Sequence, residues 1–476
     1  MNNKFEYITS KQLCDIRQQA EDRISQIRNT PNMTIPEGAT VYYLSPSGDD
    51  QNDGRSPNTA WRTLNKLSSE VIENDSYVCF ERGGVYRGVA VVRDGVTYTA
   101  YGEGEKPKLY ASPENGADPQ KWIKSDVENI WYYETGNLDI GVMVFNDGEQ
   151  WAIKALIRKC EGEELVEHAT NVPFSSWRDL NYDLQFYHDC EDKKVYLYSV
   201  QNPGERFHSI EFAIGWHMFS QASSPKNVTF DNLCFKYCGS HAIGLCEATG
   251  LTVKNCEFAW VGGSLQFYLE DGVPVRFGNA VEIWGPSSDF TVENCCFDQI
   301  YDAAMTSQFN ISDPNYECII KNVKFSRNVV QRANYSVELF LHGCKVDTPS
   351  GMYGVEVSDN LFLDAGVGYC WQRPDRVSAS HIKNSEFCRK IKDYVIKNNV
   401  MCGSVNMLIW IHGVESGFAD DDSLPILENN TFVGKIGCEF GLVEQSENGQ
   451  RRIYDEKIVD YLGERYNNNT LLFLLD

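Results

Sequence analysis

The sequence predicts a right-handed parallel β-helix, a solenoid whose coils stack around one continuous core. Three observations lead to this fold. An asparagine recurs between short apolar segments at spacings of 23 to 39 residues, and self-similarity at such a period is typical of a solenoid. The residue after each asparagine is small or apolar, as expected of one inward-facing stack. The length of 476 residues, with 42% of them apolar, suits a single solenoid with additions.

The repeated segments read VTFDNLCF, LTVKNCEF, FTVENCCF, VKFSRNVV, VEVSDNLFL, YVIKNNVM and PILENNTF. Asparagine suits a tight bend because it tolerates left-handed backbone and bonds to neighbouring backbone groups. In the first three repeats the apolar residues lie two and four positions before the asparagine. From Asn328 onward they lie three and five positions before it, which indicates one added turn residue. A β-sandwich, the rival fold, would show short and regular hairpin spacing, which is not found. Stacked asparagines are therefore expected to form a ladder from Asn232, Asn255, Asn294, Asn328, Asn360, Asn399 and Asn430.

Residues 1–39 predict one amphipathic helix. Apolar residues recur at helical spacing from Leu13 to Ile27, and Thr9 with Gln12 predicts a capping box at the start. A solenoid must cover its open end, because the terminal coil otherwise exposes core and strand edge. We expect this helix, or the segment after it, to provide that cap.

The rest of the chain divides into four parts. Short strands with Gly-rich breaks over residues 40–125 predict the first coils. Residues 126–215 lack this pattern of short strands and predict an inserted subdomain. It is expected to contain a helical stretch at WAIKALIRKC and a hairpin at LQFYHDCEDKKVYLYS. The main β-helix follows over residues 216–445, and residues 446–476 are predicted to form a C-terminal tail or cap.

Composition and net charge disfavour several classes of partner. The net charge of -24 disfavours nucleic acid and anionic membranes, and no apolar run approaches the ~20 residues of a membrane span. The opening MNNKFEYITSKQ lacks an apolar signal region, which predicts a cytoplasmic protein whose 16 cysteines stay reduced. The sequence contains no C-x-x-C motif, the spacing typical of zinc sites. The cysteines are therefore interpreted as core residues. An acidic solenoid with decorated ends is also compatible with a homo-oligomer.

The opening YYLSPSGDDQNDG…AWRTL and the asparagine-punctuated coils resemble the bacterial right-handed β-helix carbohydrate-active enzymes of the pectate-lyase-like superfamily. The resemblance covers roughly residues 40–110 and 220–445. It implies the fold and carbohydrate chemistry as a class. It does not choose one reaction, because the superfamily includes glycoside hydrolases, polysaccharide lyases and epimerases.

Candidate catalytic residues come from a second strand that follows the asparagine in each coil. In GNAVEIWG, alternation directs Glu282 and Trp284 outward, and in YSVELFLHG it directs Glu338 outward. The outward set of YDAAMTSQ is expected to be Asp302, Ala304 and Thr306. This register places the two glutamates level, two coils apart, with Asp302 on the coil between them and one same-face step along. Its α-carbon would lie roughly 8 Å from that of either glutamate.

Three converging carboxyl groups shift one another's pKa values and favour one protonated acid beside an ionised group. Glycoside cleavage needs this pair. We interpret Glu282 as the general acid, Asp302 as the nucleophile or the base that activates water, and Glu338 as a group that tunes them. Their diagonal placement favours inversion. The loop SLQFYLEDGVPVRF is expected to wall the pocket, and the candidate substrate contacts are Trp284, Gln308, Phe340, His342, His412 and Asn279.

The sequence thus predicts a glycoside hydrolase that acts without a cofactor on imported oligosaccharides. A polysaccharide lyase is the alternative, in which the same carboxylates would hold Ca²⁺ and a Lys, Arg, Tyr or His would act as base. The available arginines are Arg276, Arg332, Arg373 and Arg376, and the sequence gives none of them a convincing position. A non-catalytic carbohydrate-binding solenoid is the third possibility, although it does not call for a carboxylate cluster. Asp49, Asp50 and Asp53 resemble half of a calcium loop, but an ordinary turn is the preferred interpretation. The sequence leaves the sugar and the linkage open.

Overall fold

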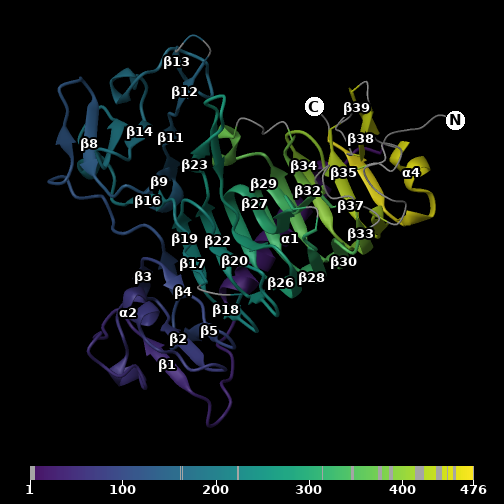
Figure 1. The fold of residues 1–476 in the computed structure, drawn as a ribbon, viewed down its shortest axis with the longest axis horizontal. Helices are drawn as coiled ribbons and strands as arrows, with labels where there is room; N and C mark the ends of the chain where they lie inside the picture. Colours follow the sequence, from purple (N-terminus) through teal and green to yellow (C-terminus); the bar gives the residue numbers. More distant parts are fainter. Residues whose placement is uncertain are drawn as a thin grey trace.

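The computed structural model describes residues 6–474, except 161, 163, 222–223, 314, 345–347, 374–377, 385–389, 413–422, 436–441, 447–448 and 454–456. The chain forms a right-handed parallel β-helix (Figure 1), the handedness that parallel crossovers favour. Each coil contributes strands to three faces around the core. Within the described residues, no helix is long and apolar enough to cross a bilayer.

The first face is an eleven-stranded parallel sheet. Its inward rows carry aromatic and branched residues such as Val78, Phe230 and Val292, all buried in the main core. The strands, in spatial order, are β1 (Val41–Leu44), β2 (Tyr77–Glu81), β5 (Thr97–Tyr101), β18 (Thr229–Asp231), β21 (Thr252–Lys254), β26 (Ser287–Glu293), β28 (Ile319–Ser326), β30 (Gly351–Ser358), β33 (Ile391–Lys397), β36 (Ile426–Glu428) and β40 (Tyr466–Asn467).

The second and third faces share two long strands that bend from one face to the other, β27 (Cys296–Asn310) and β29 (Val329–His342). The second face adds β3 (Val85–Arg87), β6 (Lys108–Tyr110), β19 (Cys234–Cys238), β22 (Glu257–Val261), β31 (Leu361–Ala365), β34 (Val400–Ser404), β37 (Thr431–Gly434) and β41 (Thr470–Phe473). The third face adds β4 (Ala90–Val91), β17 (Phe219–Ser220), β20 (Ile243–Cys246), β25 (Val281–Trp284), β32 (Ser380–Asn384), β35 (Ile409–His412) and β38 (Leu442–Ser446), which pairs with β39 (Gly449–Ile453).

The asparagines form two adjacent rows and not one. Asn328, Asn360, Asn399 and Asn430 are buried, and each backbone N–H of the first three donates to the amide oxygen of the next, at 2.9 to 3.0 Å. Asn232, Asn255 and Asn294 instead occupy the preceding bend with positive φ. Arg327 and Asp359 adopt this conformation in later coils.

The offset between the two asparagine rows corrects the prediction that the residue after every asparagine faces the core. Leu233, Cys256 and Cys295 do face the core, as expected. Val329 and Leu361, which follow their asparagines, face outward and pack under the N-terminal helix. The added turn residue noted in the sequence from Asn328 onward is the physical cause, because a shift of one residue reverses the face of each side chain.

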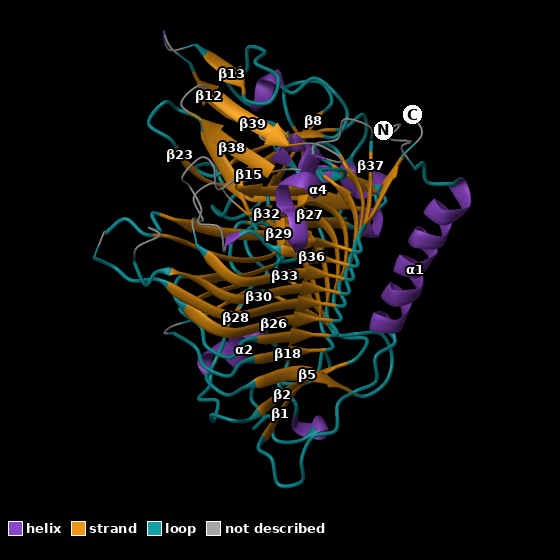
Figure 2. Cartoon of the chain, turned by 90° about the vertical axis from the view of Figure 1, so that its right-hand side faces the viewer, coloured by secondary structure: helices purple, strands orange, loops and turns teal. Residues whose placement is uncertain are grey.

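The N-terminal helix α1 (Ser10–Arg28) has the predicted capping box of Thr9 and Gln12. It does not cover an open end. Figure 2 shows it running alongside the stacked strands, where its buried stripe from Ile16 to Ile27 packs on outward apolar residues of the second face such as Leu363 and Val433. The segment after it, with α2 (Leu64–Ser69), packs on the first coils through buried residues that include Trp61, Leu64 and Leu67.

The inserted segment builds a separate five-stranded sheet from β7 (Ile123–Lys124), β8 (Ile130–Glu134), β11 (Ile153–Lys154), β14 (Gln185–Asp189) and β15 (Lys194–Tyr198). The predicted hairpin is the antiparallel pair β14–β15. The predicted helical stretch is wrong: it forms β10 (Gln150–Trp151), β11 and β12 (Ile157–Lys159), because pairing with neighbouring strands outweighs local propensity. The segment also contains β9 (Ile140–Phe145), β13 (Leu165–Glu167), α3 (Pro203–Arg206) and β16 (Ile210–Ile214).

The last coil extends beyond residue 445, where we expected the tail to begin. β40 and β41 continue the first and second faces, so the solenoid runs to Phe473, and Asn469 extends the asparagine ladder. The helix α4 (Lys457–Leu462) adds Ile458 and Leu462 to the core. At the other end, Asp49 and Asp53 each accept the backbone N–H of the residue two positions on, Gln51 and Arg55, as in an ordinary turn, and Asp50 accepts hydrogen bonds from Thr63. Most of the fourteen described cysteines are buried.

Candidate active site

The third face carries one row of outward side chains across five neighbouring strands. Strand pairing places Glu282, Thr306, Glu338, Lys383 and Trp410 level with one another, on β25, β27, β29, β32 and β35. The predicted level placement of Glu282 and Glu338, two coils apart, is therefore confirmed. Since neighbouring strands lie ~4.8 Å apart, the row forms the floor of a site that spans several coils.

Asp302 reaches this site from a different place than predicted. The residue of β27 level with the glutamates is Thr306, and Ala304 is buried in the core instead of facing outward. The register shifts between Ile300 and Ala303, where β27 bends from the second face to the third. This bend turns Asp302 back toward the row, where its charge adds to the effect of burial in raising the pKa of both Glu282 and Glu338.

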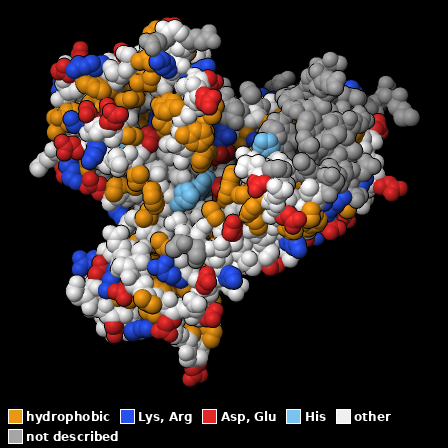
Figure 3. Space-filling view, viewed as in Figure 1, with side chains coloured by type: hydrophobic (Ala, Val, Ile, Leu, Met, Phe, Trp, Pro, Cys, Tyr) orange, Lys and Arg blue, Asp and Glu red, His pale blue; other side chains and the backbone are white. Residues whose placement is uncertain are grey.

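A cavity of about 670 Å³ contains all three predicted carboxylates, together with the predicted contacts Trp284, Gln308, Phe340 and Asn279. The antiparallel hairpin β23 (Ser264–Tyr268) and β24 (Pro274–Phe277) walls it, as the loop was predicted to do. In Figure 3, which looks onto the third face, histidine side chains lie in the hollow between the inserted segment and the coils. The remaining lining residues are His217, His241, Cys246, Gln266, Phe267, Val275, Arg276, Phe277, Arg373, Lys383 and Trp410.

Two predicted contacts fall elsewhere. His342 lies level with Asn310 beyond the cavity, with its ring 6.2 Å from that of Phe340. His412 ends β35, but its side chain lies outside the described residues. Asn279 lines the cavity, yet its amide is occupied: Nδ2 donates to Glu282 at 2.5 Å, and Oδ1 accepts from the backbone N–H of Ala303 at 2.8 Å. It therefore orients Glu282.

Glu282 is held as a weak acid. Burial raises its pKa to about 7, although hydrogen bonds from Asn279 and Gln308 oppose the shift. His241 Nδ1 lies 3.2 Å from Glu282 Oε2 and accepts the backbone N–H of Asn279 at 2.9 Å. Burial lowers the pKa of His241 to about 4, so this ring is neutral at pH 7.

The other two carboxylates are each paired with a buried cation that the sequence analysis did not place. Asp302 forms an ion pair with Arg373, and Glu338 lies 2.9 Å from Lys383 Nζ. Burial lowers the pKa of Lys383, but Glu338 and Tyr335 more than offset this and raise it, so the ammonium stays charged. Arg276 is held by backbone carbonyls of Gly263 and Gly141, at 2.6 and 3.2 Å.

Aromatic rings and an unsatisfied donor complete the cavity. Trp284, Phe267 and Phe340 line it with Trp410. The indole N–H of Trp410 is buried and has no hydrogen-bond partner in the part of the chain that the structure describes. Buried polar groups are rarely left unpaired, so this donor is available to a ligand.

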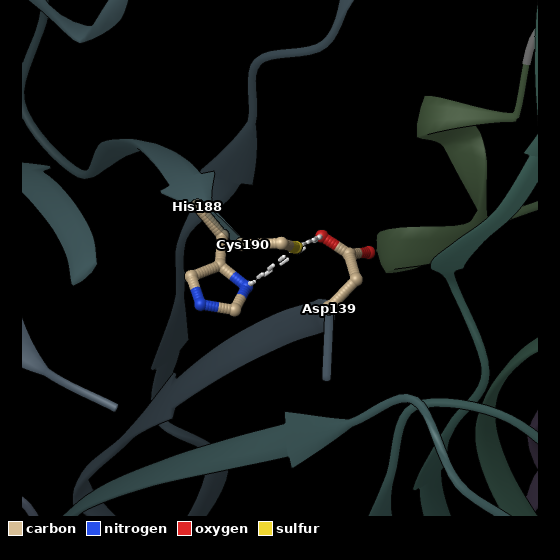
Figure 4. Close-up of side chains that lie close together, drawn as sticks. All are labelled: Asp139, His188 and Cys190. Atoms are coloured by element: carbon tan, nitrogen blue, oxygen red, sulfur yellow. Dashed lines mark hydrogen bonds and ion pairs between the residues drawn. The ribbon is translucent and has the colours of Figure 1, made fainter. Parts of the chain in front are cut away.

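One group of side chains has metal-ligand character among the described residues: Asp139, His188 and Cys190, whose ligand atoms lie within 4.8 Å of one another (Figure 4). It does not fit a cation. The buried ammonium of Lys154 pairs with Asp139, the backbone N–H of Ile140 donates to His188 Nδ1 at 3.2 Å, and burial raises the pKa of the Cys190 thiol to about 11. The cluster joins the inserted segment to the hairpin wall, since Asp139 also accepts the N–H of Leu265 at 2.5 Å.

The burial of Glu282 predicts a pH-dependent stability. Its pKa is about 7 in the folded state against 4.5 ordinarily, so the folded state binds this proton more tightly. Stability should therefore fall as pH rises from about 4.5 to about 7. Glu282→Gln removes that loss, and we expect it to raise the free energy of unfolding by about 1–3 kcal/mol at pH 8 and by much less at pH 4. Urea denaturation at both pH values measures this.

The exposed Glu103 offers a matched control for this experiment. Glu103→Gln should give the same small change at both pH values. An equal effect of Glu282→Gln at pH 4 and pH 8 would contradict the raised pKa.

Comparisons with known proteins give similarities of backbone only. No family model and no curated protein matches the sequence. A solved structure described as a glycoside hydrolase is 10% identical and covers 92% of this chain and 96% of its own, with a TM-score of 0.49. XylC in complex with xylose is 11% identical and covers 91% and 82%, with a TM-score of 0.46. A family 28 exopolygalacturonase from Yersinia enterocolitica is 10% identical and covers 85% and 67%, with a TM-score of 0.40.

A rhamnogalacturonan lyase is also among these structures. The assignment of the fold rests on this chain's own strand pairings. Together the fold and the site define a parallel β-helix protein with a carboxylate-lined cavity on its third face.

Proposed function

We propose that the protein is a glycoside hydrolase that cleaves oligosaccharides imported into the cell. One observation carries the proposal: a carboxyl group with a pKa of about 7, Glu282, lies in the same cavity as Asp302, which is paired with a guanidinium. A protonated acid beside an ionised carboxylate is the combination that glycoside hydrolysis requires. The aromatic walls and the indole N–H of Trp410 suit the apolar faces and hydroxyls of a sugar.

In this mechanism Glu282 protonates the leaving glycosidic oxygen. Asp302 acts as the nucleophile or as the base that activates water. The negative charge of Asp302 and Glu338 stabilises the positive charge that develops on the sugar ring. His241, neutral and hydrogen-bonded to the backbone of Asn279, holds Glu282 in place. We expect inversion at the anomeric centre, which proton NMR of the first product would test.

A polysaccharide lyase is favoured by one observation: the cavity contains Arg276, Arg373 and Lys383, which suit an acidic sugar. Two of these cations are engaged by carboxylates. Lys383 would be a poor base because its pKa is raised. A Ca²⁺ ion bound by Asp302 and Glu338 would have to displace both cations. We therefore keep the lyase as the second candidate.

A single assay separates the two reactions. The protein is incubated with chromogenic glycosides and with uronic-acid polymers, and both reducing ends and ultraviolet absorbance are followed. We expect new reducing ends without absorbance growth, and activity that survives a chelator. A double variant, Glu282→Gln with Asp302→Asn, is the inactive control. Absorbance growth that a chelator abolishes would overturn the hydrolase in favour of the lyase.

A further inference from the structure

A second cavity, here called the lateral groove, lies on the second face. Its volume is about 660 Å³, and it shares no lining residue with the candidate active site. Its walls come from α1, from β10 of the inserted segment and from the short helix η5 (Tyr369–Gln372). Buried Tyr301 and Tyr369 belong to the cluster at the bend between the two faces, so the two cavities are separated by packed side chains.

Three tryptophans from three distant segments line the lateral groove: Trp151, Trp260 and Trp371. The rings of Trp151 and Trp260 lie 5.6 Å apart, and Trp371 is 39% exposed. Packing alone does not require an exposed tryptophan in a cavity wall, because leaving its ring in water forfeits the free energy of burial. A ligand with an apolar face would recover that free energy by stacking on the ring.

Planar polar groups surround these rings. Arg332 Nε donates to Asp298 Oδ1 at 2.7 Å, and both side chains are about 40% exposed, at 41% and 39%. Arg28 and Glu257 form a second pair at 2.8 Å. Such pairs keep free acceptor and donor positions that can bind adjacent hydroxyl groups.

The charged side chains of the lateral groove leave a small negative balance. Three cations, Arg28, Lys236 and Arg332, stand against five carboxylates: Glu21, Asp147, Glu149, Glu257 and Asp298. This slightly negative balance, on a chain of net charge -24, repels a polyanion and gives no strong attraction for a cation. Hydroxyl groups and an apolar face without charge are the ligand chemistry that remains.

We propose that the lateral groove binds a neutral oligosaccharide, as a site separate from the cavity of Glu282 and Asp302. The proposal goes beyond the reaction and does not depend on it. The groove is placed to affect the active site nonetheless. Trp371 lines the groove, whereas Arg373, two residues further, pairs with Asp302 in the cavity. β27 links the two sites as well, with Asp298 in the groove and Asp302 in the cavity.

The test is binding of the full chain to an array of neutral oligosaccharides, including cello-, xylo- and malto-hexaose. Four proteins are compared: the wild type, Trp371→Ala in the groove, Trp284→Ala in the cavity, and Trp216→Ala. Trp216 is 48% exposed and lines neither cavity, so it controls for the loss of a surface tryptophan. Circular dichroism confirms that each variant is folded.

We expect at least one glycan whose affinity falls about tenfold or more in Trp371→Ala, as for removal of a central aromatic contact. The same glycan should bind Trp284→Ala and Trp216→Ala as it binds the wild type. The proposal is overturned if no glycan loses affinity in Trp371→Ala alone, which includes the case in which none binds. Loss in Trp284→Ala only would leave the active-site cavity as the sole sugar site.

Discussion

Asp302→Asn and Glu282→Gln are each expected to lower turnover by at least ~10²-fold, as removal of a general base or acid does. Glu282 supplies the proton with its pKa of about 7, and Asp302 is the carboxylate that Arg373 holds in the same cavity. Turnover of the most rapidly cleaved chromogenic glycoside at 25 °C measures the effect. Glu338→Gln should have a smaller effect, since Glu338 tunes the pair.

The two variants should differ in stability. Glu282→Gln replaces a buried carboxyl and should not destabilise the fold, whereas Asp302→Asn leaves the largely buried guanidinium of Arg373 without its counter-charge. Assays therefore need a temperature at which both variants are folded. Asp393→Asn is the matched control, because Asp393 is exposed on β33 of the first face, and it should retain turnover. Near-normal turnover of either cavity variant would refute the assignment.

Lys383→Met is expected to cost about 3–5 kcal/mol of folding free energy at pH 7. Both partners of the pair with Glu338 are buried, at 14% and 8% side-chain exposure, and the substitution leaves the carboxylate without a counter-charge. Chemical denaturation monitored by tryptophan fluorescence measures the loss. The exposed pair of Arg178 with Asp126, at 52% and 68% exposure, supplies the comparison: Arg178→Met should cost less than about 1 kcal/mol.

The double variant Lys383→Met with Glu338→Gln decides the cause. Because it removes both charges, it should recover much of the stability that the single variant loses. A double variant no more stable than Lys383→Met would show that the loss comes from packing against Tyr335 and Trp410, which the Lys383 ammonium overlies at 4.2 and 5.3 Å.

The fold could be predicted because its signal repeats. Each coil places an asparagine and flanking apolar residues in the same local pattern, so errors in one coil do not change the conclusion. The faces were harder to predict. A single added turn residue before Asn328 moves Val329 and Leu361 from the core to the outside, and the sequence shows the shift without showing which row stays buried.

The site residues on straight strands were predicted correctly. Those next to a bend in a strand, or after an insertion in a coil, were misplaced or missed. Glu282 and Glu338 follow from alternation. Asp302 was placed in the wrong register because a bend in β27 cannot be read from alternation. Lys383 was missed because β32 begins twenty residues after Asn360, behind an inserted segment that hides the strand in the sequence. This segment carries η5 and Arg373, so both cations come from the same coil.

The position of α1 has a consequence for the order in which the chain folds during its synthesis on the ribosome. The helix packs on residues as late as Leu472, and the backbone N–H of Ile8 donates to Phe473. Leu472 follows Arg28 by 444 positions, which take roughly 20–90 seconds to synthesise at about 5–20 residues per second. During that time the coils can stack one after another, but the apolar stripe of the helix has no complete surface to join. We therefore expect the apolar stripe of the helix to stay exposed until the coil that contains Leu472 has been synthesised, and to be open to chaperones in that interval.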